Sequence, residues 1–476
     1  MTADVLDSST TGARRLPWHM RGNYAPVLDE VDAVELQVVG EIPDGLDGHY
    51  LRNGANPKHG VSAHWFAGDG MLHGIRLRDG RAEWYRNRWV RTRSLEGARR
   101  LDPATGTFDL TVGLANTHVW GHAGRVFALE EASLPNEVTL DLDTLGPCDF
   151  DGRLRTPMTA HPHTCAETGE MHFFGYELVK APYVTYHIVD AGGTLVHSQP
   201  IDVPGPTMVH DFALSRNYAI FLDLPVAFDL DLAISGSMPF AWDSSYGARI
   251  GLLHRGRARA GEQPRWFEVP PCYVFHVMNA WDDGPSSKGT GAGADGEARY
   301  VWLDAGRHES MWNGGPDRFE PSMMWRWRFD LLTGEVREEQ LDDVSHAFPR
   351  IDERRTGLGN RFGYAVAPRD PMSERNGPDG LGGTTCIVKY DLATGSRTVH
   401  DLGPAAQSGE PVFVPAHEAA AEDEGYLVTF VYDGDTDSSR FVVLDAADMS
   451  AAPLASVSIP QRVPHGFHGS WFADSR

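Results

Sequence analysis

WRWRFDLLTGEV, residues Trp325–Val336, has the pattern of a β-strand, a tight turn and the start of a second strand. The segment IVKYDLATGSRTV at Ile387–Val399 repeats this pattern, and VTLDLDTLG near Leu140 and FVVLDAADM near Leu444 are fainter copies. Each copy has an apolar strand and an Asp, followed by a turn that contains Thr, Gly or Asp. A strand–turn–strand unit that recurs along a chain predicts the blades of a β-propeller.

Strand-length runs also fill the sequence between these copies. Examples are AEWYRNRWV, MHFFGYEL, NYAIFLDLP and EGYLVTFVYD, whereas helical periodicity is scarce. We therefore predict an all-β chain, with a disordered tail at residues 1–15 and a single domain at residues 16–476. The stretch AFDLDLAISGSMPFAWDSSYGARIG from Ala227 is apolar without being strand-like, and PSSKGTGAGADGEA from Pro285 is typical of a flexible surface loop.

Composition narrows the functional classes. The chain has 476 residues and a net charge of −24, which argues against binding nucleic acid or docking by charge on anionic membranes. Apolar contact with a membrane stays open. The four cysteines form no CxxC pair, the N-terminus shows no signal peptide, and no apolar run approaches the ~20 residues of a spanning helix. We expect a cytoplasmic protein with reduced thiols.

Four of the 21 histidines stand beside strand-like runs: His161 in TAHPH, His210 in VHDFA, His276 in FHVMNAW and His468 in GFHG. The inner strands of a propeller face one axis, so histidines of separate blades can converge there although they lie far apart in sequence. No local zinc signature such as HExxH is present. Spacing alone leaves two alternatives, a shared metal or four unrelated histidines near strand ends.

Several motifs resemble the carotenoid cleavage oxygenase family. They run in order from YLRNGANP (Tyr50–Pro57) and HWFAGDGMLHG (His64–Gly74) through ANTHVW, VHDFA, FHVMNAW, GEPVFVP and GFHG, and cover nearly the whole chain. The resemblance implies a seven-bladed β-propeller with a helical and loop dome over an iron face. It also implies a non-haem Fe(II) dioxygenase that cleaves an alkene with O₂ into two carbonyl products, without an organic cofactor.

The resemblance carries over to individual residues. It places the iron on His161, His210, His276 and His468, and the motif frames leave out the nearby residues His163, His172 and His465. Imidazole nitrogen suits Fe(II).

Three glutamates hold ligand histidines in the family, and Glu131 and Glu410 match two of them. The third position, before FPRI, is Ala347 here. Either the site is weakened, or Asp343 or another acid takes this role, because outer carboxylates orient metal-bound histidines. Thr117 matches a threonine that crowds one vacant iron position; the alternative is an ordinary strand threonine.

The substrate is less sharply indicated. Lignostilbene-cleaving relatives carry a Lys where this chain has Glu130, and a carboxylate repels a phenolate. The resemblance therefore favours a carotenoid or apocarotenoid, and the apolar stretch from Ala227 fits an entrance that contacts a membrane. Aromatic residues could line an apolar tunnel or belong to the core: Trp65, Phe66, Phe275 and Trp281. The alternatives are a stilbene or phenylpropene substrate, an apolar-ligand-binding propeller with weak activity, and an isomerase. No oligomeric state is indicated.

Overall fold

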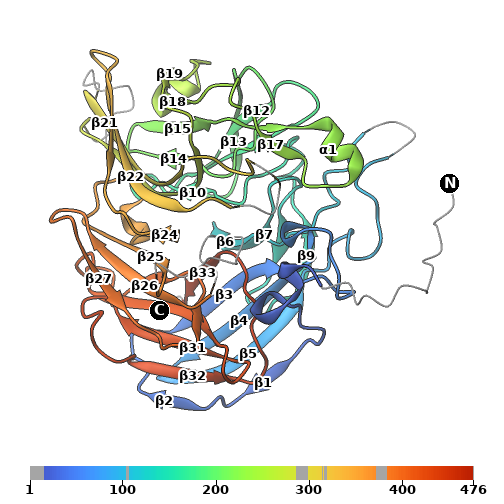
Figure 1. Ribbon diagram of the computed structural model, residues 1–476, viewed down its shortest axis with the longest axis vertical. Helices are drawn as coiled ribbons and strands as arrows, with labels where there is room; N and C mark the ends of the chain where they lie inside the picture. The colour runs from blue at the N-terminus through green and yellow to red at the C-terminus, as the bar shows by residue number, and fades with distance from the viewer. Residues whose placement is uncertain are drawn as a thin grey trace.

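The computed structural model describes residues 16–102, 107–285, 298–313, 315, 319–370 and 383–474. In these residues, seven sheets of four or more strands surround a central axis as the blades of a propeller (Figure 1). The predicted all-β, seven-bladed propeller is confirmed. The predicted N-terminal tail and nearly all of the Gly-rich loop after Pro285 lie outside the described residues.

The first three blades contain thirteen strands. Blade 1 holds β1 (Asp32–Val34), β3 (Gly48–Ala55), β4 (Gly70–Arg78), β5 (Arg81–Trp89) and β33 (Gly469–Ala473). Blade 2 holds β6 (His118–His122), β7 (Arg125–Leu129), β8 (Asn136–Val138) and β9 (Thr144–Pro147). Blade 3 holds β10 (His163–Thr164), β11 (Met171–Tyr176), β12 (Val184–Val189) and β13 (Leu195–Ile201).

The other four blades follow in chain order. Blade 4 holds β14 (Ala213–Leu214), β15 (Tyr218–Asp223), β18 (Arg249–His254) and β19 (Arg265–Glu268). Blade 5 holds β20 (Tyr273–Asp282), β21 (Tyr300–His308), β22 (Ser322–Asp330) and β23 (Val336–Gln340). Blade 6 holds β24 (Ala347–Arg350), β25 (Phe362–Pro368), β26 (Thr385–Asp391) and β27 (Ser396–His400). Blade 7 holds β28 (Ala406–Ser408), β29 (Val412–Pro415), β30 (Gly425–Asp433), β31 (Ser438–Asp445), β32 (Ala455–Ile459) and β2 (Val38–Gly40).

The remaining described elements are short. They are a ribbon of β16 (Val226–Phe228) and β17 (Phe240–Trp242), helices α1 (Leu230–Ser235) and α2 (Arg255–Ala258), and the 3₁₀ turns η1 (Trp18–Met20), η2 (Gly22–Tyr24), η3 (Trp65–Ala67) and η4 (Glu353–Arg355). The apolar stretch from Ala227 thus forms part of the ribbon and α1. No helix among the described residues is long and apolar enough to span a membrane.

The two clearest sequence repeats are the outer hairpins of blades 5 and 6. In each turn an Asp side chain accepts backbone N–H groups: Asp330 from Leu332 at 2.9 Å, and Asp391 from Ala393 at 3.1 Å. The glycines that follow, Gly334 and Gly395, have φ of 80° and 69°, in the left-handed region that glycine adopts without steric cost. The repeated Asp and Gly are therefore the residues that close each hairpin.

Both ends of the chain close the propeller. β33 pairs with β3 in blade 1, and β2 pairs with β32 on the outer edge of blade 7, so blue and red strands lie side by side in Figure 1. Between these two blades Tyr50 packs against Phe430 and Phe441, with ring centroids 5.3 and 5.4 Å apart. Full burial of one such aromatic side chain contributes about 1.5–3 kcal/mol. The closure fixes β33, which immediately follows His468.

Candidate metal centre

The four histidines singled out in the sequence converge on the propeller axis. His161 precedes β10 by two residues, His210 precedes β14 by three, His276 lies within β20 and His468 immediately precedes β33. They thus lie in or just before the inner strands of blades 3, 4, 5 and 1. One ligand atom of each lies within 4.8 Å of all the others. The propeller fold therefore brings together four histidines that lie far apart in the sequence.

The spacing of the ring nitrogens fits one shared metal ion. The Nε2 atoms of His161 and His210 are 3.0 Å apart, and those of His276 and His468 are 3.2 Å apart. Two nitrogens bound to one ion at about 2.1 Å lie about 3.0 Å apart when their bonds are near right angles. Neutral imidazole also suits divalent iron, cobalt and zinc. The donor set is therefore that of a metal site.

Burial keeps two of the four rings neutral. It lowers the pKa of His161 and of His276 well below the usual histidine value, and the neighbouring rings lower both further. A neutral ring offers the lone pair that a metal needs. Burial also disfavours charge on His210, but the adjacent Glu131 carboxylate outweighs it and raises the pKa of that ring.

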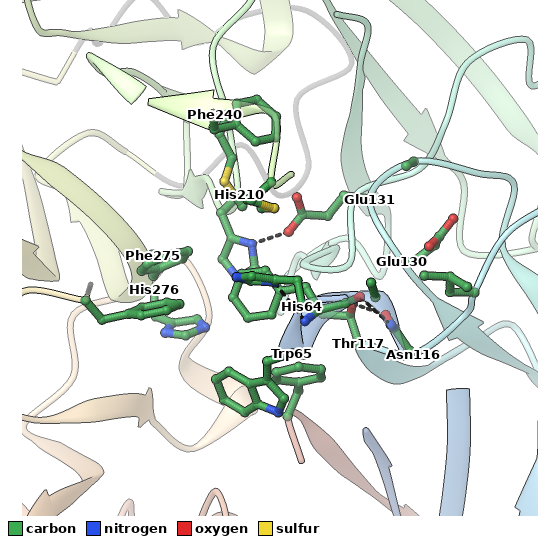
Figure 2. A pocket seen from close by; sticks show the side chains of 18 of the residues that line it. His64, Trp65, Asn116, Thr117, Glu130, Glu131, His210, Phe240, Phe275 and His276 are labelled. Atoms are coloured by element: carbon green, nitrogen blue, oxygen red, sulfur yellow. Dashed lines mark hydrogen bonds and ion pairs between the residues drawn. The ribbon is translucent and has the colours of Figure 1, made fainter. Parts of the chain in front are cut away.

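Glu131 holds His210 from the side away from the cluster. Its Oε1 faces Nδ1 of His210, the contact drawn as a dashed line in Figure 2. Its Oε2 accepts a hydrogen bond of 2.8 Å from the hydroxyl of Tyr176. With Nδ1 directed at a carboxylate, Nε2 is left free for the metal, and the ligand becomes more basic.

Glu410, which lies between β28 and β29, orients His468 as Glu131 orients His210. Nδ1 of His468 donates to Oε1 at 2.9 Å, while Oε2 accepts from the backbone N–H of Gly469 at 2.9 Å and from Arg350 at 3.1 Å. Burial alone would raise the pKa of Glu410, but Arg350 and then His468 lower it to about 2. Glu410 is thus a fixed anion that orients one ligand.

His276 lacks such a partner. Ala347 begins β24 and lines the cavity beside His276, and no carboxylate among the described residues contacts that ring. The alternative that Asp343 fills the role is wrong, because its side chain is 89% exposed and points to Arg397. His276 instead packs against Phe348, with ring centroids 5.3 Å apart. The ring is held by packing rather than by a carboxylate.

Replacing Ala347 by Glu is expected to strengthen metal binding, because an outer carboxylate typically contributes about 10–100-fold in metal affinity or activity. The measurement is iron content per chain by elemental analysis after loading at limiting Fe(II). Ala347→Gln is the matched control, since it adds similar volume without charge. Equal occupancy in the wild type and Ala347→Glu would contradict the expectation.

The cluster opens on one side into a cavity of about 480 Å³. His210, His276 and His468 line this cavity, as do Thr117 and three of the four aromatic residues considered for a tunnel, Trp65, Phe66 and Phe275. Figure 2 shows the labelled residues of this lining around the open space. For Trp281, the alternative of a tunnel residue is excluded. That ring stacks on Trp302 with centroids 5.8 Å apart, and it does not line the cavity.

Thr117 and the loop before β6 form part of the cavity wall. The Thr117 hydroxyl donates to the side chain of Asn116 at 3.0 Å, and its carbonyl accepts the N–H of His468 at 3.1 Å. Asn116 in turn donates to the carbonyls of Phe66 and Gly68 at 2.8 and 2.7 Å. These bonds tie a ligand, a threonine and an aromatic wall into one unit.

The three histidines that the motif frames left out have other partners. His163 lies 2.8 Å from the carbonyl oxygen of Phe212, and His172 accepts from Arg255 at 2.8 Å. The ring of His465 packs against Tyr24, with centroids 4.7 Å apart. Further polar residues of the cavity were missed from sequence: His308, Ser322 and His346. They lie in no motif, and only the position of His346 beside Ala347 could have drawn attention to them.

A family model described as retinal pigment epithelial membrane protein matches residues 24–473. The chain belongs to this family. A carotenoid cleavage oxygenase of Mycobacterium tuberculosis is 38% identical over 505 aligned residues, covering 95% of this chain and 97% of that protein. Carotenoid 9,10(9′,10′)-cleavage dioxygenase 1 of Pisum sativum is 34% identical, covering 97% of this chain and 91% of its own.

Solved structures of the family share the fold. A lignostilbene dioxygenase of Pseudomonas brassicacearum superposes with a TM-score of 0.82 at 27% identity, covering 97% of this chain and 100% of its own. A cobalt-substituted apocarotenoid oxygenase of Synechocystis gives 0.79 at 26% identity, covering 94% and 97%. The expected enzyme class, an oxygenase of this family, is confirmed. The four-histidine cluster and the cobalt-bearing neighbour also confirm a metal-dependent site.

Proposed function

We propose that this protein is a non-haem Fe(II) dioxygenase that cleaves a C=C bond of a carotenoid or apocarotenoid with O₂. The observation that carries the proposal is the position of the cluster. Four imidazoles, His161, His210, His276 and His468, meet where a cavity of about 480 Å³ with a largely apolar lining reaches the axis. A polar substrate would leave its hydrogen-bonding groups unpaired against such walls.

The reaction balances without a further reductant. The C=C and O–O bonds break and two C=O bonds form, so each carbonyl product carries one oxygen atom. Bound iron supplies the one-electron chemistry through which O₂ reacts with a closed-shell alkene. Glu131 and Glu410 keep His210 and His468 oriented, while Phe66 and Phe275 exclude water and hold the polyene. We assign to Thr117 the restriction of one open coordination position.

The proposal is tested with protein loaded with Fe(II) under O₂. A panel of β-apocarotenals, β-carotene, resveratrol and isoeugenol is supplied, and aldehyde products are identified by mass spectrometry. Aldehydes from the polyenes are the expected result. Products only from the phenolic substrates would show that the enzyme cleaves stilbenes or phenylpropenes instead. Binding without product would indicate a ligand-binding propeller.

Glu130 bears on the choice between polyenes and phenols. It lines the cavity, is buried, and its Oε1 has no hydrogen-bond partner among the described residues. A carboxylate here repels a phenolate. Glu130→Lys is expected to raise kcat/KM for resveratrol at least about 10-fold, the scale of one charge-assisted hydrogen bond. Glu130→Gln is the control, because it removes the negative charge without adding a positive one. Equal kcat/KM for Lys and Gln variants would contradict the prediction.

We further propose that substrate enters beside α1 from a membrane surface. Leu230 and Ile234 of this helix are 60% and 75% exposed, and the residues that follow, Gly236 to Phe240, line the cavity. An apolar helix face next to a cavity mouth can rest on lipid without spanning it.

A further inference from the structure

One corner of the cavity carries polar atoms that the metal site does not use. Ser322 begins β22, and His346 directly precedes β24. Both residues are buried, and both line the cavity. Nε2 of His346 is a buried nitrogen without a hydrogen-bond partner among the described residues. Buried polar groups are nearly always paired, so this nitrogen indicates a missing partner, and the hydroxyl-bearing Ser322 lines the cavity beside it.

Gly306 lets these two groups share one opening. A Cβ added at Gly306 would lie 2.5 Å from Oγ of Ser322 and 3.2 Å from Nε2 of His346, so both atoms border the space that a side chain would occupy. The backbone N–H of His346 donates to the carbonyl of Ser322 at 3.0 Å, which holds the two residues together. We call Gly306, Ser322 and His346 the polar corner.

His308 borders the polar corner on β21. It pairs with Ser322 across the sheet, and its Nδ1 lies 2.7 Å from the carbonyl oxygen of Glu320, which places the proton there and leaves Nε2 as an acceptor. Burial lowers the pKa of both His308 and His346 to about 4, so both rings are neutral near pH 7. The corner therefore offers neutral donors and acceptors, which suit a hydroxyl or carbonyl rather than an ion.

The polar corner and Glu130 lie at different sides of the cavity. Its residues belong to blade 5 and the start of blade 6, whereas Glu130 follows the second strand of blade 2, about half-way around the propeller. The cavity thus extends from Glu130 to the polar corner, and His210, His276 and His468 also line it. A polyene with oxygen at its end could place that oxygen in the corner while an internal double bond lies at the metal.

We propose that the polar corner binds the terminal hydroxyl or carbonyl oxygen of the substrate and thereby selects which double bond is cleaved. This inference rests on the proposed cleavage of a polyene. It narrows the substrate to an apocarotenoid aldehyde or alcohol, because a hydrocarbon carotene leaves Nε2 of His346 unpaired. A site built to hydrogen-bond an oxygen discriminates against the analogue that lacks it.

Anaerobic binding separates this inference from the proposed function, since cleavage needs O₂. Iron-loaded protein is titrated under nitrogen with a β-apocarotenal, its alcohol and the methyl-terminated hydrocarbon of equal length, and quenching of tryptophan fluorescence reports Kd. The wild type is expected to bind both oxygenated polyenes about 10-fold more tightly than the hydrocarbon, and Ser322→Ala and His346→Leu each lose about 3–10-fold of that preference. Equal binding of all three by the wild type would overturn the inference.

Ser439→Ala is the control, because Ser439 is also buried but accepts the N–H of Val463 at 2.9 Å, in blade 7. It is expected to keep the wild-type preference. A loss of preference in this variant, or equal weakening of all three ligands by Ser322→Ala, would also overturn the inference. Ser322→Ala removes a single oxygen atom and decides the matter if His346→Leu does not fold.

Aerobic products complete the test. With O₂ admitted, the wild type is expected to give one pair of carbonyl fragments from the β-apocarotenal, and Ser322→Ala a mixture that includes a neighbouring cleavage position. An unchanged single position in both corner variants would contradict the role in selection. Selective binding without any product would contradict the proposed function while leaving the oxygen-binding corner supported.

Discussion

Replacing His468 by Ala is expected to abolish metal retention and to lower the rate of alkene cleavage by more than about 100-fold, since loss of a mere outer partner of a ligand already costs about 10–100-fold. His468 is the ligand that ties the site to the closure of the propeller. Its Nε2 lies 3.2 Å from that of His276, and its own residue directly precedes β33. Alanine removes one of the four imidazole nitrogens of the cluster.

The measurement is metal per chain after dialysis against a weak chelator, together with single-turnover product formation. His172→Gln is the matched control, because His172 is also a fully buried histidine near an inner strand, but it contacts Tyr186 and Arg255 instead of the cluster. We expect this control to lose stability and to keep its metal. Full metal retention in His468→Ala would exclude this residue as a ligand.

The repeat of the blades was predictable from the sequence, because residues close together in the chain determine each outer hairpin. Asp330 and Gly334 close one outer hairpin through contacts within a few residues, and the same chemistry recurs in blade 6. The closure of the propeller in blade 1 was not predictable from local sequence. The pairing of β3 with β33 joins residues more than 400 positions apart, and no local turn or periodicity encodes a partner at that distance.

The motifs named four histidines as metal ligands, and only the fold shows that these four lie close together. Spacing along the chain does not predict that His161 and His468 face each other, because that depends on how blades 4 to 7, which lie between them in the chain, are arranged around the axis. The departure at Ala347 was visible in the sequence, but its consequence was not. Only the structure shows that the ring beside Ala347 is His276, which contacts no carboxylate among the described residues, and that His346, the residue before Ala347, lines the same cavity.

Replacing Glu410 by Gln is expected to lower metal affinity by about 10–100-fold, because an amide orients the Nδ1–H of His468 less strongly than a carboxylate. It also removes a buried charge partner of Arg350, whose side chain is only 10% exposed. Breaking a buried ion pair costs about 3–5 kcal/mol, and we expect the lower end, because Arg350 keeps its bond of 2.9 Å to Glu353. Affinity is measured by competition with a chromogenic chelator, and stability by urea unfolding of metal-free protein.

Glu353→Gln is the matched control, since Glu353 binds the same Arg350 but is 44% exposed. An exposed pair contributes at most about 1 kcal/mol, so this variant should bind metal normally.

The pKa of Glu410 is lowered to about 2 in the folded protein, so its contribution to stability is present above the ordinary glutamate range and is lost as pH falls toward 2. The stability difference between wild type and Glu410→Gln should therefore shrink below about pH 4.3. A difference that stays constant from pH 7 to pH 3 would mean that the charge on Glu410 contributes nothing, and that shape alone holds His468 in place.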